Sequence, residues 1–331
     1  MTTTLEQAAE RVAALLSGTA GAVRDSGDAG GGLEFESHVV LHPLERLAPP
    51  PDAWAVDGGQ ALVADARCLQ VFVTRAARVR FRDGRCVAEV EGELRAHVLG
   101  GADERAAALA SLVVDGMAPD TSVDVNLLRD RWEWEAAARC VEEAEAGAVV
   151  LVDGDLQPDW RIPSSFLAGL LARAHERRVL LAGVTKHSSL ARGGAPLLGQ
   201  LEMEAASSLG PRARWWAPVA RTRASSRSDV GAGLQVVAAR LDPDARFSFR
   251  VDLPAHADPA AALGRLAALS DDAGFPGYPY PLTVADRLAA CPGWLRAEAW
   301  SQLDELLARA GVTTEARERA FTDRHRLMER S

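Results

Sequence analysis

The sequence predicts an α/β protein, because three apolar stretches have the pattern of buried strands and each ends in a charged residue. The central stretch is an uninterrupted apolar run over residues 148–152 that stops at Asp153. A run of this length and composition is typical of a strand buried on both faces. The same pattern recurs where residues 54–56 lead into Asp57 and residues 179–185 lead into Lys186. Since open α/β sheets bind ligands at the carboxyl ends of their strands, we expect these charged residues to form one site.

Composition and charge limit the class of protein. The chain has 331 residues, 48% of them hydrophobic and 25% charged, which suffices for one large domain or two ordinary ones. It contains no apolar run of membrane-spanning length, no signal-peptide pattern and no CxxC pair among its four cysteines. We therefore expect a cytoplasmic protein without a membrane contact or structural zinc. With a net charge of −9, any nucleic-acid binding has to rely on a local groove or a partner.

Lys186 is the only lysine in the sequence; the other residues among the 37 Lys and Arg are all arginine. An ammonium group is a compact point charge that a planar guanidinium does not replace. Its position at a strand end therefore favours a functional role. Codon bias combined with chance is the alternative explanation.

The first third of the chain predicts a terminal helix followed by a meander. An amphipathic pattern predicts a helix over residues 3–17, and a Gly/Ser/Asp-rich linker follows up to residue 32. We therefore separate an N-terminal helix and linker (1–32) from a main domain (33–331). Strands are expected within residues 61–65, 69–82 and 85–93, with a hairpin turn at Asp83-Gly84, and a helix over 103–116.

A helix predicted over residues 124–146, with Asp124 as its cap, carries a candidate ligand. Glu133 shares its face with Ala137 and Cys140, whereas Glu135 lies on the charged face. A carboxylate on an apolar face is costly to bury unless it is paired or bound to metal. Glu133 is therefore predicted to point inward. The alternative is a slightly rotated helix that leaves Glu133 at its periphery.

The second half of the chain begins with a parallel crossover unit. A strand over residues 148–153, a helix over 163–177 and a strand over 179–185 have the spacing of a right-handed crossover. Further elements are then expected: strands at 234–241 and 246–252, helices at 258–270 and 282–290, and C-terminal helices at 294–310 and 314–328 within residues 294–331.

Between these parts, residues 187–232 are predicted to be an irregular insertion that is basic and aromatic. No acidic residue interrupts a short segment that holds Arg212, Arg214, Trp215, Trp216, Arg221, Arg223 and Arg227. Basic residues interleaved with aromatic ones can bind a nucleic-acid strand through phosphate contacts and base stacking. The equally weighted alternative is a surface loop whose tryptophans pack on the core.

The candidate site combines acidic residues from separate elements. Asp57, Glu133 and Asp153 offer the carboxylate oxygens that hard divalent ions such as Mg²⁺ or Mn²⁺ prefer. Such a set holds one or two ions, and a pair of ions stabilises the attacking and leaving oxygens of a phosphoryl displacement. Asp155 is either a further ligand or a cap of the turn. Lys186 is expected to neutralise the scissile phosphate or to position the attacking water.

The sequence resembles the NurA nucleases. The resemblance runs in order along most of the chain, through AVDGGQ (55–60), LLRDRWEWEAA (127–137), VVLVDGDL (149–156), LLAGVTKHSSL (180–190) and GYPYPLTVADRLA (277–289). It implies an RNase H-like (PIWI-like) mixed sheet flanked by helices, with helical additions at both termini. It also implies a Mn²⁺-dependent (or Mg²⁺-dependent) 5′–3′ exonuclease and single-strand endonuclease. Such a nuclease acts as a homodimer with a HerA-type hexameric DNA translocase in DNA end processing.

Carried over by position, the resemblance makes Asp57, Glu133 and Asp153 the metal carboxylates. Lys186 matches the motif lysine, and Tyr280 matches the tyrosine before the last site element. One position departs from the family, because Asp286 stands where a histidine is usual. An aspartate can bind a metal ion but cannot act as a neutral imidazole ligand. Asp286 therefore either replaces the histidine as a ligand or marks a slower, differently tuned or inactive member.

Two rival functions remain at this stage. One is a haloacid-dehalogenase-like phosphatase with Asp153 as covalent nucleophile and Asp155 as its partner. The long segment before this motif and the residue Gln157 argue against that class. The other is a DNA-end adaptor for a motor, with a decayed site, which the exchange at Asp286 suggests.

Overall fold

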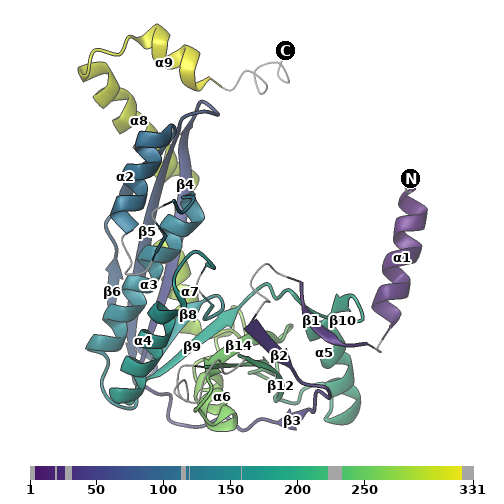
Figure 1. The fold of residues 1–331 in the computed structure, drawn as a ribbon. Helices are drawn as coiled ribbons and strands as arrows, with labels where there is room; N and C mark the ends of the chain where they lie inside the picture. The colour runs from purple at the N-terminus through teal and green to yellow at the C-terminus, as the bar shows by residue number, and fades with distance from the viewer. Residues whose placement is uncertain are drawn as a thin grey trace.

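The computed structural model describes residues 4–18, 21–26, 32–112, 117–118, 120–157, 159–222 and 233–322. Its centre is an eleven-stranded mixed sheet whose main path runs β2-β12-β13-β14-β9-β8-β4-β5-β6 (Figure 1). Strand β3 pairs with β12 and β7 pairs with β5 beside this path. A small separate sheet joins β1, β10 and β11. The expected α/β class is therefore confirmed, as is a mixed sheet flanked by helices.

The strands of both sheets have the following bounds: β1 Val23–Asp25, β2 Leu33–Phe35, β3 His42–Pro43, β4 Ala53–Asp65, β5 Gln70–Arg82, β6 Arg85–Glu91, β7 Arg95–Leu99, β8 Val149–Asp153, β9 Leu180–Thr185, β10 Leu190–Arg192, β11 Ala195–Pro196, β12 Trp215–Thr222, β13 Leu234–Arg240 and β14 Phe249–Pro254.

The helices of the described residues have these bounds: α1 Leu5–Ser17, α2 Ala102–Leu112, α3 Val125–Glu143, α4 Ser164–Glu176, α5 Leu197–Ser208, α6 Pro259–Ala267, α7 Tyr280–Ala289, α8 Gly293–Arg309 and α9 Thr314–Phe321. The expected cap of α3 is present, because the Asp124 side chain accepts a hydrogen bond of 2.9 Å from the Leu127 amide.

The parallel centre of the sheet brings the predicted strand ends together. Strand β8 lies between β4 and β9 and is parallel to both. Val56 of β4 pairs with Val152 of β8, so Asp57 and Asp153 are the next residues along two neighbouring strands. The apolar residues of β8 are buried, as expected of a strand covered on both faces.

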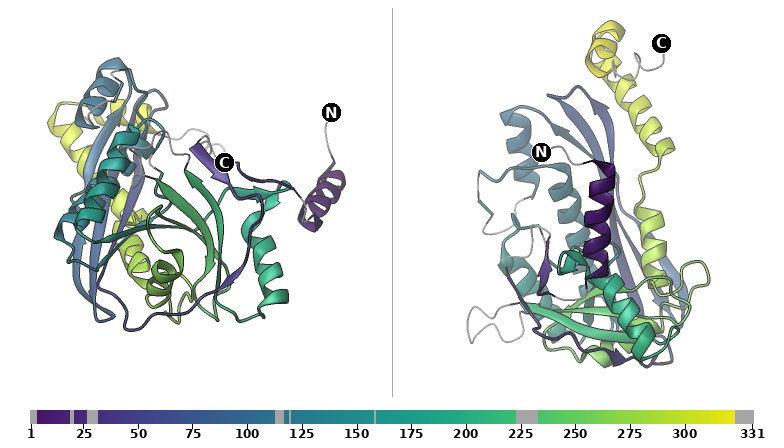
Figure 2. Two further views of the ribbon diagram at one scale, coloured as in Figure 1. Left: turned by 60° about the horizontal axis from the view of Figure 1, so that its bottom comes forward. Right: turned by 90° about the vertical axis from the view of Figure 1, so that its right-hand side faces the viewer.

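Helices cover the two faces of this centre (Figure 2). Helices α3 and α4 share one apolar core with β8, through residues such as Leu128, Val141 and Leu171. Helices α6 and α7 pack on the opposite face, where Leu263 and Leu282 belong to a second core. Strands β4 and β5 extend beyond this layered part as a long ribbon, and Asp83-Gly84 forms the tight turn between β5 and β6.

Regular structure occurs in two segments that were predicted to be irregular. Residues 187–222 contain β10, β11, α5 and β12, whereas an irregular insertion was expected over 187–232, of which 223–232 lie outside the described residues. Helix α5 packs on the sheet through the fully buried Leu197 and Leu201, an apolar face too short to stand out in the sequence. The linker expected up to residue 32 contains β1, which pairs with β10. The strand has only three residues, and the polar and glycine residues before and after it in the sequence gave no strand pattern.

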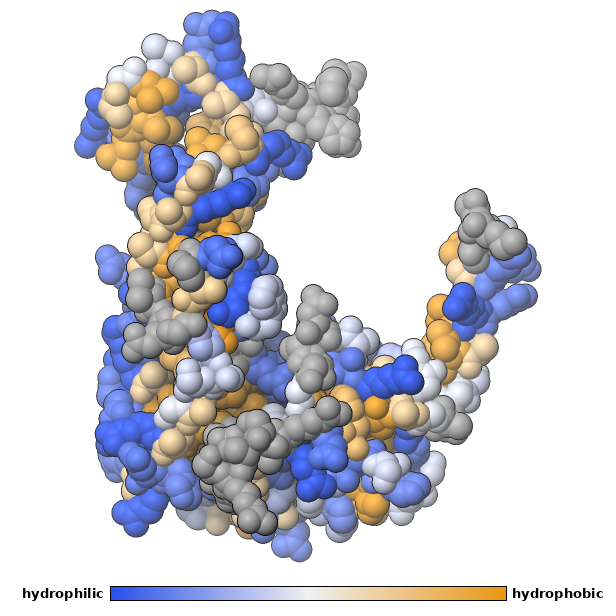
Figure 3. Space-filling view, viewed as in Figure 1, coloured by the Kyte–Doolittle hydropathy of each residue, from blue (hydrophilic) through white to orange (hydrophobic). Residues whose placement is uncertain are grey.

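The terminal helices extend from the layered part of the molecule. Neither α1 nor α8 contributes a buried residue, and Leu5, Val12 and Leu16 of α1 are exposed. Figure 3 shows that apolar and polar residues occupy different sides of α1. Within the described part of the chain, none of the helices has the length and apolar character needed to cross a membrane.

Candidate metal centre

Three aspartates converge where β4, β8 and α7 meet. Asp57, Asp153 and Asp286 each offer a carboxylate oxygen, and these atoms all lie within 4.8 Å of one another. Asp57 and Asp153 come from neighbouring parallel strands, whereas Asp286 comes from α7, which packs on β4. The structure thus brings together the two strand-end aspartates expected from the sequence. It also brings Asp286, which the resemblance offered as a possible ligand, into the same group.

Two glycines after Asp57 allow this convergence. A Cβ atom on Gly59 would overlap the carbonyl oxygen of Ala289, so the end of α7 packs directly on the β4 backbone. On the other side, a Cβ on Gly58 would lie 2.8 Å from Oε2 of Glu133. The Asp-Gly-Gly sequence therefore provides the carboxylate and the space for the two helices beside it.

Glu133 lies behind the three aspartates and points inward, as predicted. It is on the buried face of α3 and only 7% exposed. Burial, and then the nearby charge of Asp57, raise the pKa of the Glu133 carboxyl well above its usual range. Glu133 is outside the group of three whose oxygens lie within 4.8 Å. Its side chain lies next to Gly58, beside Asp57, and is not a member of that group.

Lys186 joins two members of the acidic group. Its Nζ atom lies 2.6 Å from Oδ2 of Asp153 and 2.8 Å from Oδ1 of Asp286. Burial lowers the pKa of the lysine, but the hydrogen bonds to Asp153 and Asp286 outweigh this effect and raise it. The ammonium group is therefore charged, and it compensates part of the negative charge that the site concentrates.

Asp57 holds its proton unusually strongly. Burial is the main cause, and repulsion by the Asp153 carboxylate adds to it, so the pKa of Asp57 rises to about 7. A hydrogen bond of 2.7 Å from the Gly58 amide opposes the shift. Ionised Asp57 and Asp153 repel each other, and a cation bound between them would relieve this repulsion.

The raised pKa of Asp57 gives the metal-free protein a defined pH dependence. The folded state binds this proton with a pKa of about 7, against 3.8 ordinarily, so unfolding releases a proton between these values. The contribution of Asp57 to the free energy of unfolding therefore falls as the pH rises from 4 to 7, by up to about 1.4 kcal/mol per unit.

Denaturant titrations of the parental chain and of Asp57→Asn measure this contribution as a difference. We expect the parental chain to lose stability relative to the variant up to pH 7 and no further above it. A stability difference that does not change with pH would contradict the assignment. Added Mn²⁺ should reduce the loss, because a cation binds the ionised cluster.

The structure distinguishes the two tyrosines of the GYPYPL segment. Tyr278 is buried, and its ring centroid lies 5.2 Å from Nζ of Lys186. Tyr280, the predicted site residue, is partly exposed, and its ring packs edge-on against Phe81 with centroids 5.7 Å apart. Phe81 pairs with Ala53, at the start of β4, whereas Asp57 lies four residues further along that strand. Tyr278, and not Tyr280, therefore lies next to Lys186.

The Tyr278 hydroxyl is a buried polar group beside Asp153. It makes no hydrogen bond of standard geometry to any described residue. Burial, followed by the charge of Asp153 and a weak hydrogen bond with it, raises the pKa of this phenol far above its usual range, so it stays protonated. Its position beside Asp153 fits a site that receives a further oxygen atom from water or substrate.

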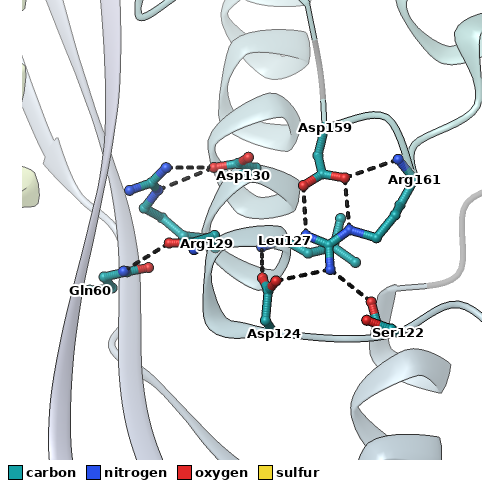
Figure 4. A network of polar contacts seen from close by, with 9 residues as sticks. Gln60, Ser122, Asp124, Leu127, Arg129, Asp130, Asp159 and Arg161 are labelled. Atoms are coloured by element: carbon teal, nitrogen blue, oxygen red, sulfur yellow. Dashed lines mark hydrogen bonds and ion pairs between the residues drawn. The ribbon is translucent and has the colours of Figure 1, made fainter. Parts of the chain in front are cut away.

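Sequence reasoning missed Arg129, which borders the site. A Cβ atom on Gly58 would lie 3.0 Å from Cγ of Arg129, one helical turn before Glu133. Figure 4 shows Arg129 with its guanidinium on Asp130, where Nη2 and Oδ1 are 2.8 Å apart. The spacing of four residues between Arg129 and Glu133 is the sequence signal for their common helix face.

The arginine and tryptophan segment lies in β12 and the turn before it, and one of its tryptophans packs in the core, as the alternative interpretation expected. Trp215 is only 1% exposed and part of the core, so it cannot stack on a base. Trp216 points to the other face of β12, as alternation requires, and stacks on His42 at 4.7 Å. The described arginines are each paired with an acid: Arg212 with Asp244, Arg214 with Asp242, and Arg221 with Glu36. Arg223 and Arg227 lie outside the described residues.

The donor set fits a hard divalent cation. Three carboxylates within reach of one another supply the oxygen ligands that Mg²⁺ and Mn²⁺ prefer. Asp155 does not add a ligand, because it caps the turn by accepting from the Gln157 amide at 3.1 Å and faces Arg250. The residues that fit the cation are thus Asp57, Asp153 and Asp286.

A mixed sheet with carboxylates at the ends of neighbouring parallel strands makes this an α/β protein with an acidic cluster at the edge of its sheet. Within this class, the chain has the fold of the NurA nuclease from Sulfolobus solfataricus. That structure matches with a TM-score of 0.55 and 16% sequence identity, over 83% of this chain and 88% of that one. The fold agrees with the resemblance noted in the sequence.

Two other solved structures match less well. A second NurA structure has a TM-score of 0.44 and 9% identity, over 74% of this chain and 86% of that one. The catalytic domain of human Endonuclease V has a TM-score of 0.38 and 16% identity, over 82% and 93% of the two chains. No family model and no curated protein sequence matches the chain.

Proposed function

We propose that this protein is a divalent-metal-dependent DNA nuclease. The observation that carries the proposal is the convergence of Asp57, Asp153 and Asp286 within 4.8 Å, with Lys186 beside them. The NurA-like fold supports the same function, since it places these residues at the sheet edge where α/β proteins bind ligands.

Each residue of the site has a role in this proposal. Asp57, Asp153 and Asp286 hold one or two cations, Mn²⁺ or Mg²⁺, which when bound polarise the phosphate and activate water. Lys186 places a positive charge next to the scissile phosphate. The Tyr278 hydroxyl stays protonated and donates a hydrogen bond to an oxygen brought in by substrate or water. Glu133 lies beside Asp57, whose charge adds to the effect of burial in raising the pKa of the Glu133 carboxyl.

The resemblance to NurA extends the proposal to activity and partners. We infer 5′–3′ exonuclease and single-strand endonuclease activity in cytoplasmic DNA end processing, together with a HerA-type hexameric translocase. We also infer a homodimer. Its support is the exposed apolar side chains of the terminal helices, which include Leu5 and Val12 of α1 and Trp294 and Leu306 of α8.

Two alternatives have less support. A DNA-end adaptor with a decayed site would not need three converging carboxylates, and Asp286 completes the group rather than interrupting it. A phosphatase of the haloacid-dehalogenase type would need Asp155 beside Asp153 as a proton donor. Asp155 instead caps its own turn and faces Arg250, with 3.8 Å between Oδ2 and Nη1.

Incubation of the purified chain with single-stranded DNA and Mn²⁺ separates the three functions. The proposed nuclease converts the strand to shorter products, and EDTA stops the reaction. Release of phosphate from small esters without DNA cleavage would instead identify a phosphatase. Binding of DNA without cleavage at any tested concentration of Mn²⁺ or Mg²⁺ would identify an adaptor and refute the proposal.

A further inference from the structure

Arg75 is a buried arginine of β5 that donates hydrogen bonds to the end of α7. The residue is 7% exposed. Its Nε donates to the Ala289 carbonyl at 3.2 Å, and its Nη2 donates to the Ala290 carbonyl. Its Nη1 forms an ion pair with Glu91, whose side chain is half exposed and in contact with water. Because Ala289 is buried, its carbonyl depends on a partner within the protein, and Arg75 is that partner.

The end of a helix is a site where an arginine has a specific effect. The last carbonyls of an α-helix have no partner inside the helix, and they carry partial negative charge. A guanidinium presents several N–H groups in one plane, so it binds two carbonyls and a carboxylate together, whereas an ammonium group is a single point donor. The helix that follows, α8, begins at Gly293 and contributes no buried residue. Arg75 therefore fixes the last turn of α7 to the sheet.

This last turn carries Asp286. The Ala290 amide donates to the Asp286 carbonyl at 2.9 Å, so Arg75 binds the residue that closes the turn begun by Asp286. The Asp286 side chain is 54% exposed, and packing leaves it free to turn toward water. The direction of its carboxylate is therefore set by the placement of α7, together with the hydrogen bond from Lys186.

Arg75 lies beside a point of close contact between α7 and β4. Gly59 of β4 touches the Ala289 carbonyl, since a Cβ atom on Gly59 would overlap that oxygen. Arg75 is the residue that pairs with Gly59 on the neighbouring strand. The helix end is therefore clamped against the sheet two residues along β4 from Asp57.

We propose that Arg75 is a positioning residue for the metal centre. It holds the last turn of α7 on the sheet, so that the Asp286 carboxylate stays beside Asp57 and Asp153. The inference rests on the proposed function, because that function makes Asp286 a ligand of the cation. Arg75 itself touches neither the cation nor the substrate and acts through Asp286.

Mn²⁺ binding without DNA, measured by electron paramagnetic resonance of the free ion, tests this role separately from cleavage. Residues that orient metal ligands typically contribute a factor of about 10 to 100 to metal affinity, so Arg75→Met should weaken Mn²⁺ binding by about that factor. Arg75→Lys should recover part of the affinity, because it restores the charge and one donor. Arg78→Met is the matched control, since Arg78 is on the same strand but donates to Glu143 of α3. It should bind Mn²⁺ with the parental affinity.

The Asp286→Asn background distinguishes positioning from a general effect on the fold. There, Arg75→Met should change the Mn²⁺ affinity by less than about twofold, because the carboxylate that Arg75 positions is already gone. Parental affinity in Arg75→Met would overturn the inference. So would an equal loss of affinity in both backgrounds, or the unfolding of both Arg75 variants in thermal denaturation. If the parental chain binds no Mn²⁺, the proposed metal site fails first and this inference fails with it.

Discussion

Asp57→Asn is expected to reduce Mn²⁺-dependent DNA cleavage by at least about a hundredfold. The substitution removes one of three carboxylates that converge on the proposed cation, together with its negative charge. A bound metal ion contributes several kcal/mol of transition-state stabilisation, and each 1.36 kcal/mol changes the rate tenfold. The amide side chain has nearly the same shape as the carboxylate, so the fold is preserved. Asp153→Asn should have the same effect, because Asp153 belongs to the same group.

The same variant should be more stable than the parental chain when metal is absent. Asp57 is held with a raised pKa because burial and Asp153 disfavour its ionised form, and the neutral amide avoids this cost. Asp65→Asn is the matched control, since Asp65 lies on the same strand at the far end of the ribbon. We expect it to cut DNA at the parental rate. Cleavage by Asp57→Asn at the parental rate would show that the carboxylates do not form the site.

Arg250→Met is expected to lower the free energy of unfolding by about 3–5 kcal/mol, the cost of removing one partner of a buried ion pair. Arg250 is 2% exposed and donates from Nε to Oδ1 of Asp252 at 2.8 Å and from Nη2 to Oδ2 at 3.0 Å. Its Nη1 donates to Oδ2 of Asp25 at 3.2 Å. Without the guanidinium, the fully buried Asp252 would lose its counter-ion and keep only the hydrogen bond from the Leu156 amide.

Denaturant titration measures this loss, and two further variants test its cause. Arg246→Met changes an exposed arginine four residues earlier and should leave the unfolding midpoint nearly unchanged. Adding Asp252→Asn to Arg250→Met removes the stranded charge and should restore part of the stability. The explanation fails if Arg250→Met unfolds at the parental denaturant concentration, or if the second substitution only adds to the loss.

The sequence predicted the parts of the site that depend on strand pattern. Asp57, Asp153 and Lys186 were found because apolar runs mark buried strands, and parallel strands end at a common edge. The inward orientation of Glu133 followed from helix periodicity alone. Asp286 could be named only through the resemblance to NurA. It reaches the site because α7 packs on β4, and these elements are more than 200 positions apart, so no local pattern indicates their contact.

Other features depended on tertiary contacts that no local pattern encodes. Tyr278 and Tyr280 are two residues apart around a proline, and only the packing of α7 decides which ring meets Lys186. The arginines near Trp215 looked free to bind phosphate, but their acidic partners Glu36, Asp242 and Asp244 lie elsewhere in the chain. A list of charges in sequence order does not show which of them are already neutralised.

The pairing of β1 with β10 places the start of the folded unit before residue 33. Asp25 of β1 accepts hydrogen bonds from Arg250 and from the Ser189 hydroxyl. Arg250 belongs to β14 and also faces Asp155, so Asp25 joins β1 to the main sheet. A shortened chain that starts at residue 33 would delete a buried counter-ion, although the composition places the boundary there. The folded unit therefore includes residues 21–26. A truncated chain that is meant to fold should begin before Gly21.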